Sequence, residues 1–89
     1  MLKSARYNED VMNLSNVPQG QRARLVSVGG RLRSKLMQYG LRIGDDVRVL
    51  RCALLGGPLL IEVNQREIAL GRAVAEKILV ELEVECESR

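Results

Sequence analysis

The stretch that most constrains the fold is residues 36–44, with the sequence Leu-Met-Gln-Tyr-Gly-Leu-Arg-Ile-Gly. Apolar side chains lead into it with the i, i+4 and i+7 spacing of an amphipathic helix, at Leu32, Leu36 and Tyr39. Gly40 follows where this helix must end, because a left-handed residue at a helix terminus is least strained as glycine. The sequence therefore predicts a short helix that stops before Gly40.

The leucines on either side of Gly40 have a defined role in such a helix end. Leu36 and Leu41 occupy the two positions whose side chains touch in a Schellman motif, so they are expected to pin the helix to the core. The residues after Leu41 predict a turn, and residues 47–51 continue as a strand. One short segment thus ends a helix, anchors it and starts a strand.

Most of the remaining chain has the pattern of short strands separated by turn signals. We expect strands at residues 22–28, 46–53, 59–63, 67–70 and 78–85. The alternation slips by one near Leu25, which indicates a β-bulge. Residues 59–63 are apolar at nearly every position, which indicates burial on both sides or another bulge. Asn64-Gln65 predicts a hairpin turn, and residues 71–77 predict a single helical turn.

The predicted fold class is mainly β. The chain has 89 residues, which is one domain with a small core, and its only aromatic residues are Tyr7 and Tyr39. The core must therefore be built from Leu, Ile, Val and Ala. About five short strands in so small a chain are expected to close into an SH3-like β-barrel, because closure removes exposed edges. One inserted amphipathic helix and a short helical turn complete this architecture.

The expected domain covers residues 14–85. Residues 1–13 are polar and show no clean period, so they are expected to form a mobile tail or an irregular helix. They lack the apolar segment of a signal peptide, and no part of the chain approaches the roughly 18 apolar residues of a membrane span. A cytoplasmic protein is therefore expected.

The net charge of +3 is unevenly distributed. Residues 1–51 carry ten Lys and Arg against four Asp and Glu, and residues 52–89 carry four against seven. The basic side chains that would serve a nucleic-acid interface are Arg22, Arg24, Arg31, Arg33, Lys35, Arg42 and Arg48. A solvated arginine-rich surface is the simpler interpretation, because aromatic residues for base stacking are lacking. No nucleic-acid partner is expected, although this class stays open as an alternative.

Catalytic, cofactor and metal sites are not expected in this chain. It has no His, so the usual general base near neutral pH is missing, and ferrous sites commonly use His or clustered Cys. Cys52 and Cys86 have neither the number nor the spacing of a metal motif. Asp45-Asp46 is interpreted as a solvated turn. The glutamates at alternate positions of the last strand are interpreted as its solvent face.

Four ordered motifs carry a resemblance to a known family. They are Leu14-Ser15 followed by Pro18-x-Gly20-x-x-Ala23-x-Leu25-Val26, then Arg31-Leu32 with Leu36-Met37-Gln38-Tyr39-Gly40-Leu41-x-x-Gly44, then Leu55-Gly56-Gly57-Pro58-Leu59, and finally Ile68-Ala69-Leu70-Gly71 with Ala75-Glu76-Lys77-Ile78. In this order they resemble FeoA, a family of small cytosolic proteins of bacterial ferrous iron transport. The resemblance implies an SH3-like barrel that acts through a partner, the cytosolic G-protein portion of the iron-transporting membrane GTPase FeoB. It also implies contact with the membrane only through that partner.

A partner-binding surface is expected around the loop that precedes residue 59. The candidate residues are Leu36, Met37, Leu54, Leu55, Gly56, Gly57 and Pro58. Gly-Gly-Pro cannot continue a regular ladder, so the two leucines before it lie in an irregular loop. Either both leucines fold under the loop and cap the barrel, or at least one stays exposed beside the predicted helix as an apolar anchor.

A stand-alone SH3-like domain related to metal-dependent repressors is an alternative class, although this chain contains no DNA-binding helix-turn-helix pattern. The sequence is also compatible with both a monomer and a homo-oligomer.

Overall fold

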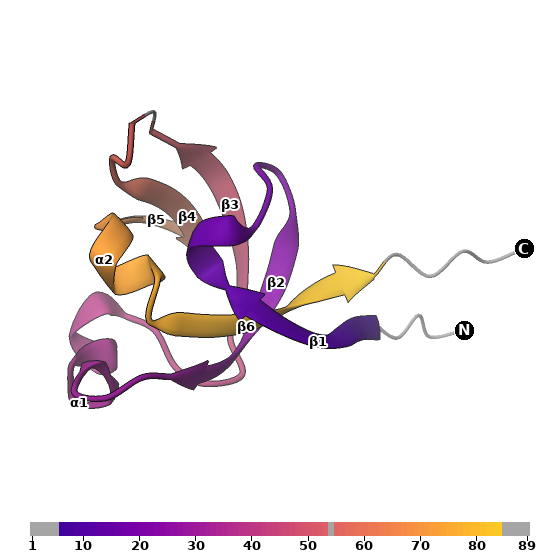
Figure 1. Cartoon of the computed structure of the whole chain (residues 1–89), viewed down its shortest axis with the longest axis horizontal. Coiled ribbons are helices and arrows are strands. Elements are labelled where there is room, and N and C mark those ends of the chain that lie inside the picture. Colours follow the sequence, from indigo (N-terminus) through magenta and orange to yellow (C-terminus); the bar gives the residue numbers. More distant parts are fainter. Residues whose placement is uncertain (1–5, 54, 85–89) are drawn as a thin grey trace, which may run out of the picture.

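The structure is a computed structural model and describes residues 6–53 and 55–84. It is mainly β, as predicted, with the six strands arranged in one antiparallel sheet in the order β1-β6-β2-β3-β4-β5 (Figure 1). In chain order the elements are β1 (Arg6–Asn13), the 3₁₀ turn η1 (Leu14–Asn16), β2 (Arg22–Val28), α1 (Leu32–Lys35), the 3₁₀ turn η2 (Leu36–Tyr39), β3 (Asp46–Cys52), β4 (Leu59–Val63), β5 (Arg66–Leu70), α2 (Arg72–Ala75) and β6 (Ile78–Val84).

The sheet bends around a single core but does not close into a complete barrel. Strands β1 and β5 are its two edges, and among the described residues no hydrogen-bonded ladder joins them. The two helical inserts, α1 with η2 and α2, lie at one side of the bent sheet (Figure 1). The small SH3-like class is confirmed, while the expectation of full closure is not met.

The core is entirely aliphatic, as the scarcity of aromatic residues requires. No polar or charged residue is buried among the described residues. The buried side chains are Leu14, Val17, Ala23, Leu25, Leu32, Leu36, Leu41, Val47, Val49, Leu59, Ile61, Val63, Leu70, Ala75, Ile78 and Val80. Burying each large aliphatic side chain contributes about 1.5–3 kcal/mol, and this burial is the main force holding the sheet in its bent form.

Strand β4 differs from the expectation that residues 59–63 are buried on both sides or bulged. Its side chains alternate between buried and half-buried, so it is neither buried on both faces nor bulged along its pairing with β5. The irregularity lies instead in its neighbour β3, where the register shifts between Val49 and Arg51. The other apolar side chain of β4, Leu60, is half-buried on the outer face.

The bulge and the hairpin predicted from the sequence are both confirmed. The pairing of β2 with β6 shifts register between Leu25 and Ser27, where the alternation slips. Asn64 and Gln65 join β4 to β5 with φ angles of 52° and 68°, the two positive values that a two-residue type I′ hairpin requires.

The N-terminal segment differs from the expectation of a mobile tail or an irregular helix. Residues 6–13 form β1, which pairs with β6 through partners such as Met12 with Val80. Their polar composition concealed the strand because β1 is an edge, with Met12 packed against the core and Val11 47% exposed. Residues 1–5 of the predicted tail lie outside the described residues.

The helix end at Gly40 has the predicted Schellman geometry. Gly40 has φ of 82° and ψ of 24°, in the left-handed region. Its N–H donates to the Met37 carbonyl at 3.0 Å, and the Leu41 N–H donates to the Leu36 carbonyl at 3.2 Å. Leu36 and Leu41 are both buried, so the motif ties the helical insert to the core. The last turn is 3₁₀ rather than α-helical, which is common at helix ends.

The turn after the helix is fastened to β2. The Gly44 N–H donates to the Leu25 carbonyl at 2.8 Å, and the Leu25 N–H donates to the Asp45 carbonyl at 2.9 Å. The Asp45 carboxylate accepts the Arg42 N–H at 2.9 Å and so closes the turn. This confirms a structural role for Asp45 in the turn and places the bulge of β2 directly against it.

Substitution of Gly40 tests the helix end. We expect Gly40→Val to lower the free energy of unfolding by about 1–2 kcal/mol, because a β-branched side chain is strained at this positive φ. Lys35→Ala, at an exposed position of α1, should change it by less than about 0.5 kcal/mol. Thermal denaturation followed by circular dichroism measures both, and equal shifts for the two variants would contradict this account of Gly40.

Candidate functional site

The loop that joins β3 to β4 displays one leucine completely in solvent. Leu55 is 103% exposed, the largest value among the exposed apolar side chains of the described residues. The base of the loop is closed by the Ala53 N–H, which donates to the Pro58 carbonyl at 3.1 Å. Leu54, the other leucine of the predicted surface, lies outside the described residues. Exposure of at least one loop leucine was one of the two alternatives left open by the sequence.

The backbone of Leu55 makes this exposure unusual. Leu55 and Gly56 have φ angles of 58° and 76°, so a leucine occupies a left-handed position that turns normally give to Asn, Asp or Gly. Such a conformation costs a branched apolar residue of the order of 1 kcal/mol. Neither burial nor backbone preference therefore explains a leucine here, and such features concentrate at functional sites.

A small apolar hollow lies at the foot of the same loop. Its volume is about 130 Å³, and its lining residues are Arg51, Ala53, Pro58, Leu59, Leu60 and Ala69. Leu60 and Ala69 face each other across β4 and β5 on the outer side of the sheet. The exposed Leu55 and this hollow together form a compact apolar feature, which we call the loop surface (Leu55 to Pro58 with Ala53, Leu60 and Ala69).

The helical half of the predicted surface divides into one buried and one exposed side chain. Leu36 is only 4% exposed and belongs to the core, so its predicted role in partner contact is wrong. The Schellman motif explains this placement, because it turns Leu36 inward against Leu41. Met37 is 77% exposed and remains available.

The loop and the helix are not neighbours, although the sequence interpretation placed them side by side. Figure 1 shows the loop between β3 and β4 at the top of the view and α1 at the bottom, with α2 between them. Met37 therefore cannot belong to the same compact feature as Leu55. A partner that touches both must reach from the loop to the helical insert.

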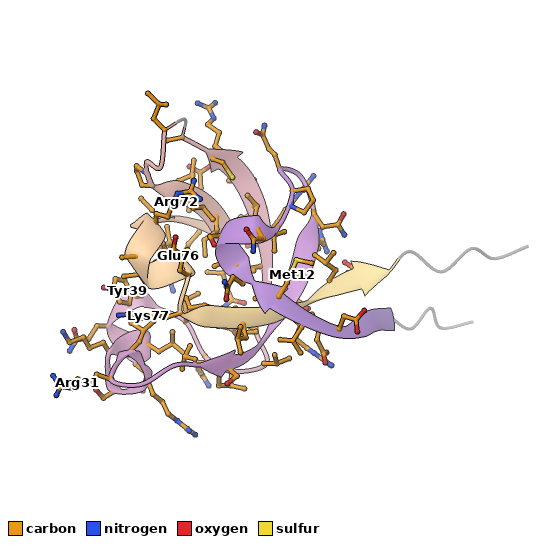
Figure 2. All side chains as sticks on the ribbon, viewed as in Figure 1. Met12, Arg31, Tyr39, Arg72, Glu76 and Lys77 are labelled. Atoms are coloured by element: carbon orange, nitrogen blue, oxygen red, sulfur yellow. The ribbon has the colours of Figure 1, made fainter. Side chains whose placement is uncertain are left out.

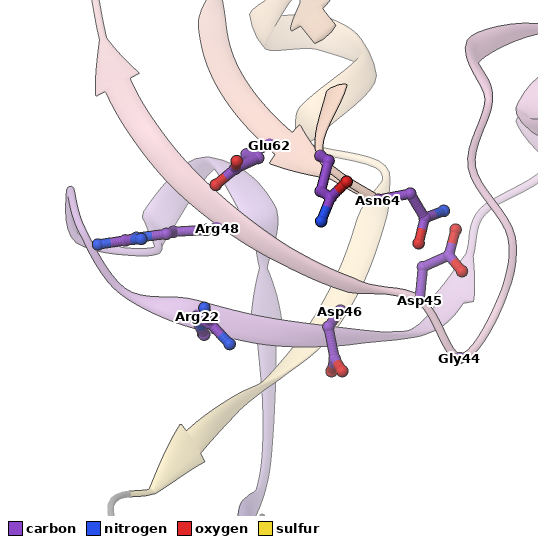
Figure 3. A pocket seen from close by; sticks show the side chains of 8 residues that line it. Arg22, Gly44, Asp45, Asp46, Arg48, Glu62 and Asn64 are labelled. Atoms are coloured by element: carbon purple, nitrogen blue, oxygen red, sulfur yellow. The ribbon is translucent and has the colours of Figure 1, made fainter. Parts of the chain in front are cut away.

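The basic residues of β2 and β3 are interleaved with acids. Arg22 lies directly opposite Arg48, and Arg48 lies opposite Glu62. These side chains line a polar hollow of about 390 Å³ on the outer face, together with Asp45, Asp46 and Asn64 (Figure 3). The mixture of signs gives this hollow no strong preference for an anion such as a nucleic-acid phosphate.

The acidic face of β6 is partly paired. Glu81 accepts a hydrogen bond from the Arg24 guanidinium at 2.8 Å, which forms an ion pair across β2 and β6.

Cys52 is half-buried and packs against the core. Within the described residues no three His, Cys, Asp or Glu side chains come together as metal ligands. Cys86 and Glu85 lie outside the described residues.

No helix in the described part of the chain has the length and apolar character needed to cross a lipid bilayer. The bent six-stranded antiparallel sheet with its short helical inserts, and a site made of a protruding apolar loop, define a small SH3-like β module.

The particular family follows from comparison with known proteins. Residues 12–82 match the family model described as FeoA domain, so the chain belongs to the FeoA family. It is 34% identical over 73 residues to the Fe(2+) transport protein A/Fe(2+) transporter FeoB fusion protein of Porphyromonas gingivalis, an alignment that covers 80% of this chain and 9% of that protein. The chain thus spans less than a tenth of this curated relative.

Solved structures agree with this assignment. The solution structure of FeoA from Chlorobium tepidum is 36% identical with a TM-score of 0.74, covering 85% of this chain and 74% of that one. FeoA of Stenotrophomonas maltophilia, complexed with zinc, is 28% identical with a TM-score of 0.65, covering 78% of this chain and 88% of that one. That protein is described as an SH3 domain protein and a candidate activating factor of bacterial ferrous iron transport.

Adjacent residues of η2 provide a test of which apolar side chains are core and which are surface. We expect Leu36→Ala to lower the free energy of unfolding by about 2–5 kcal/mol, because it leaves a cavity in the core. Met37→Ala should change it by less than about 0.5 kcal/mol. Urea denaturation measures both values, and a small cost for Leu36→Ala would contradict its assignment to the core.

Proposed function

We propose that this chain is an accessory protein of bacterial ferrous iron transport that acts by contact with the cytosolic GTPase portion of a FeoB-like transporter. Membership of the FeoA family supports this proposal. The fusion protein of Porphyromonas gingivalis carries transport protein A and FeoB in one polypeptide, which supports an association between the two. The protein would act in the cytoplasm, reach the membrane only through FeoB and catalyse no reaction itself.

The exposure and the backbone conformation of Leu55 are the observation that supports a contact with a partner. A fully exposed leucine in a left-handed turn position is costly for an isolated domain, and the cost is offset when a partner buries the side chain. Large side chains that enter a pocket on a partner supply much of the binding energy of protein interfaces. Leu55 is therefore the proposed anchor, and the Gly56-Gly57-Pro58 segment holds it away from the sheet.

The rest of the loop surface suits the rim of such an interface. The apolar hollow between Ala53, Pro58, Leu60 and Ala69 can receive one small apolar side chain of the partner beside the anchor. Met37, in the helical insert that follows α1, is a second and separate contact in this proposal, used only if the partner extends from the loop to that insert. Leu36 takes no part because it is buried.

Replacement of Leu55 by Asn separates binding from folding. Asn tolerates a left-handed conformation better than Leu, so Leu55→Asn should leave the melting temperature equal or raise it. The same change removes the apolar anchor, and we expect the affinity for the cytosolic GTPase domain of FeoB to fall by about tenfold or more. Calorimetric titration of the folded variant with that domain provides the measurement.

Two matched variants serve as controls for this experiment. Leu55→Met keeps a large apolar side chain and should retain most of the affinity. Ile43→Asn removes another exposed apolar side chain, one that lies in a different turn and is 48% exposed, and should have little effect. Unchanged affinity of Leu55→Asn, or an equal loss in Ile43→Asn, would show that Leu55 is not the anchor.

A further inference from the structure

A third hollow lies between the two helical inserts, on the side of the molecule where α1 and α2 approach each other. Its volume is about 290 Å³, and its lining residues are Arg31, Leu32, Lys35, Tyr39, Ala73, Val74 and Lys77. Figure 2 shows Tyr39 and Lys77 close together in this region, with Arg31 beyond them at the end of α1. The proposed FeoB contact at the loop surface uses none of these residues.

The charges around this hollow have one sign. Arg31 precedes α1, Lys35 ends it and Lys77 follows α2, so three separate backbone positions bring three cations to one site. No acidic residue lines the hollow, and in the described residues none of the three cations has an ion pair. Glu76 is adjacent in the sequence to Lys77 but does not line the hollow. The cations therefore repel one another, and a bound anion relieves that repulsion.

The floor of the hollow is apolar. Leu32 is 8% exposed and joins the core, while Tyr39 and Val74 are half-buried and pack against it. A free inorganic anion would contact the cations but would leave the apolar floor exposed to water, so it does not suit the whole hollow. The hollow suits a ligand that carries negative charges and an apolar group close together, and a peptide segment with both is such a ligand.

The geometry points to a docking site for an acidic segment of a protein partner, with carboxylates at Arg31, Lys35 and Lys77 and one apolar side chain on Leu32, Val74 and the Tyr39 ring. Charge complementarity selects this occupant over a neutral segment, because the three cations attract carboxylates and gain nothing from uncharged side chains. The inference deepens the proposed function by giving the chemistry of a second patch on the protein partner.

The site can be tested with defined probes and the full chain. The probe is a synthetic peptide, Glu-Glu-Leu-Glu-Glu-Leu-Glu-Glu, titrated into isotopically labelled protein and followed by amide chemical shifts. We expect the shifts to concentrate at the residues that line the hollow. The affinity should weaken as salt rises from about 0.05 to about 0.3 M, because the cations are exposed and screened. Shifts concentrated elsewhere would overturn the proposal.

Matched charge reversals distinguish a local site from net charge. Lys35→Glu with Lys77→Glu should weaken peptide binding by about tenfold or more, since two attractions become repulsions. Arg33→Glu with Arg42→Glu changes the net charge equally, and Arg33 shares α1 without lining the hollow. This control should weaken binding by less than about threefold. Equal losses in both pairs would show a net-charge effect and overturn the site.

Two further probes exclude other occupants. A peptide with Gln at every Glu position should not bind, whereas equal binding would overturn the role of the cations. A single-stranded decathymidylate should bind more weakly than the acidic peptide, and tighter binding in the same hollow would replace the proposal with a nucleic-acid site. None of these assays contains the transporter, so their failure is distinguishable from failure of the FeoB contact tested at Leu55.

Discussion

The left-handed stop at Gly40 is the constraint on which the arrangement of this molecule depends. Two hydrogen bonds close the helix end there, and they turn Leu36 and Leu41 together into the core. The turn that follows is bonded to Leu25 in β2, so the helical insert and the start of β3 are fixed to the sheet at one place. A helix of only a few residues could not hold this position by its own stability, because isolated short helices are marginal in water.

The exposed leucine and the cations of the candidate sites lie outside the aliphatic core. Every buried side chain in the described part of the chain is apolar, and neither Leu55 nor the cations around the hollow between α1 and α2 contribute to that core. Loss of these surface groups should therefore affect association rather than folding. The two sites also differ in chemistry, since one offers an apolar anchor and the other attracts carboxylates. A partner that meets both is recognised by two independent properties of its surface.

The local features of the fold could be predicted from the sequence, and the non-local ones could not. The helix stop at Gly40, the bulge near Leu25 and the Asn64-Gln65 hairpin depend on residues close together in the chain. Strand β1 is missed because its pairing with β6 joins the two ends of the described chain, and its polar edge composition gives no alternation. The distance of the loop from α1 is likewise tertiary. The local Schellman pattern predicted that Leu36 packs on the core, and its separate assignment to the partner surface conflicted with that prediction. The sequence left the exposure of a loop leucine as one of two alternatives, and the exposed side chain of Leu55 decides between them.

Hydrogen–deuterium exchange of the chain with and without the cytosolic GTPase domain of FeoB tests the central claim most directly. The claim is that the loop between β3 and β4 contacts the partner and that the core keeps its structure when the partner binds. The account predicts that the partner slows exchange of the amides at Leu55, Gly56 and Gly57, with no change at the core strands β2 and β3. Protection confined to β1, or no protection at the loop in a complex that demonstrably forms, would contradict it.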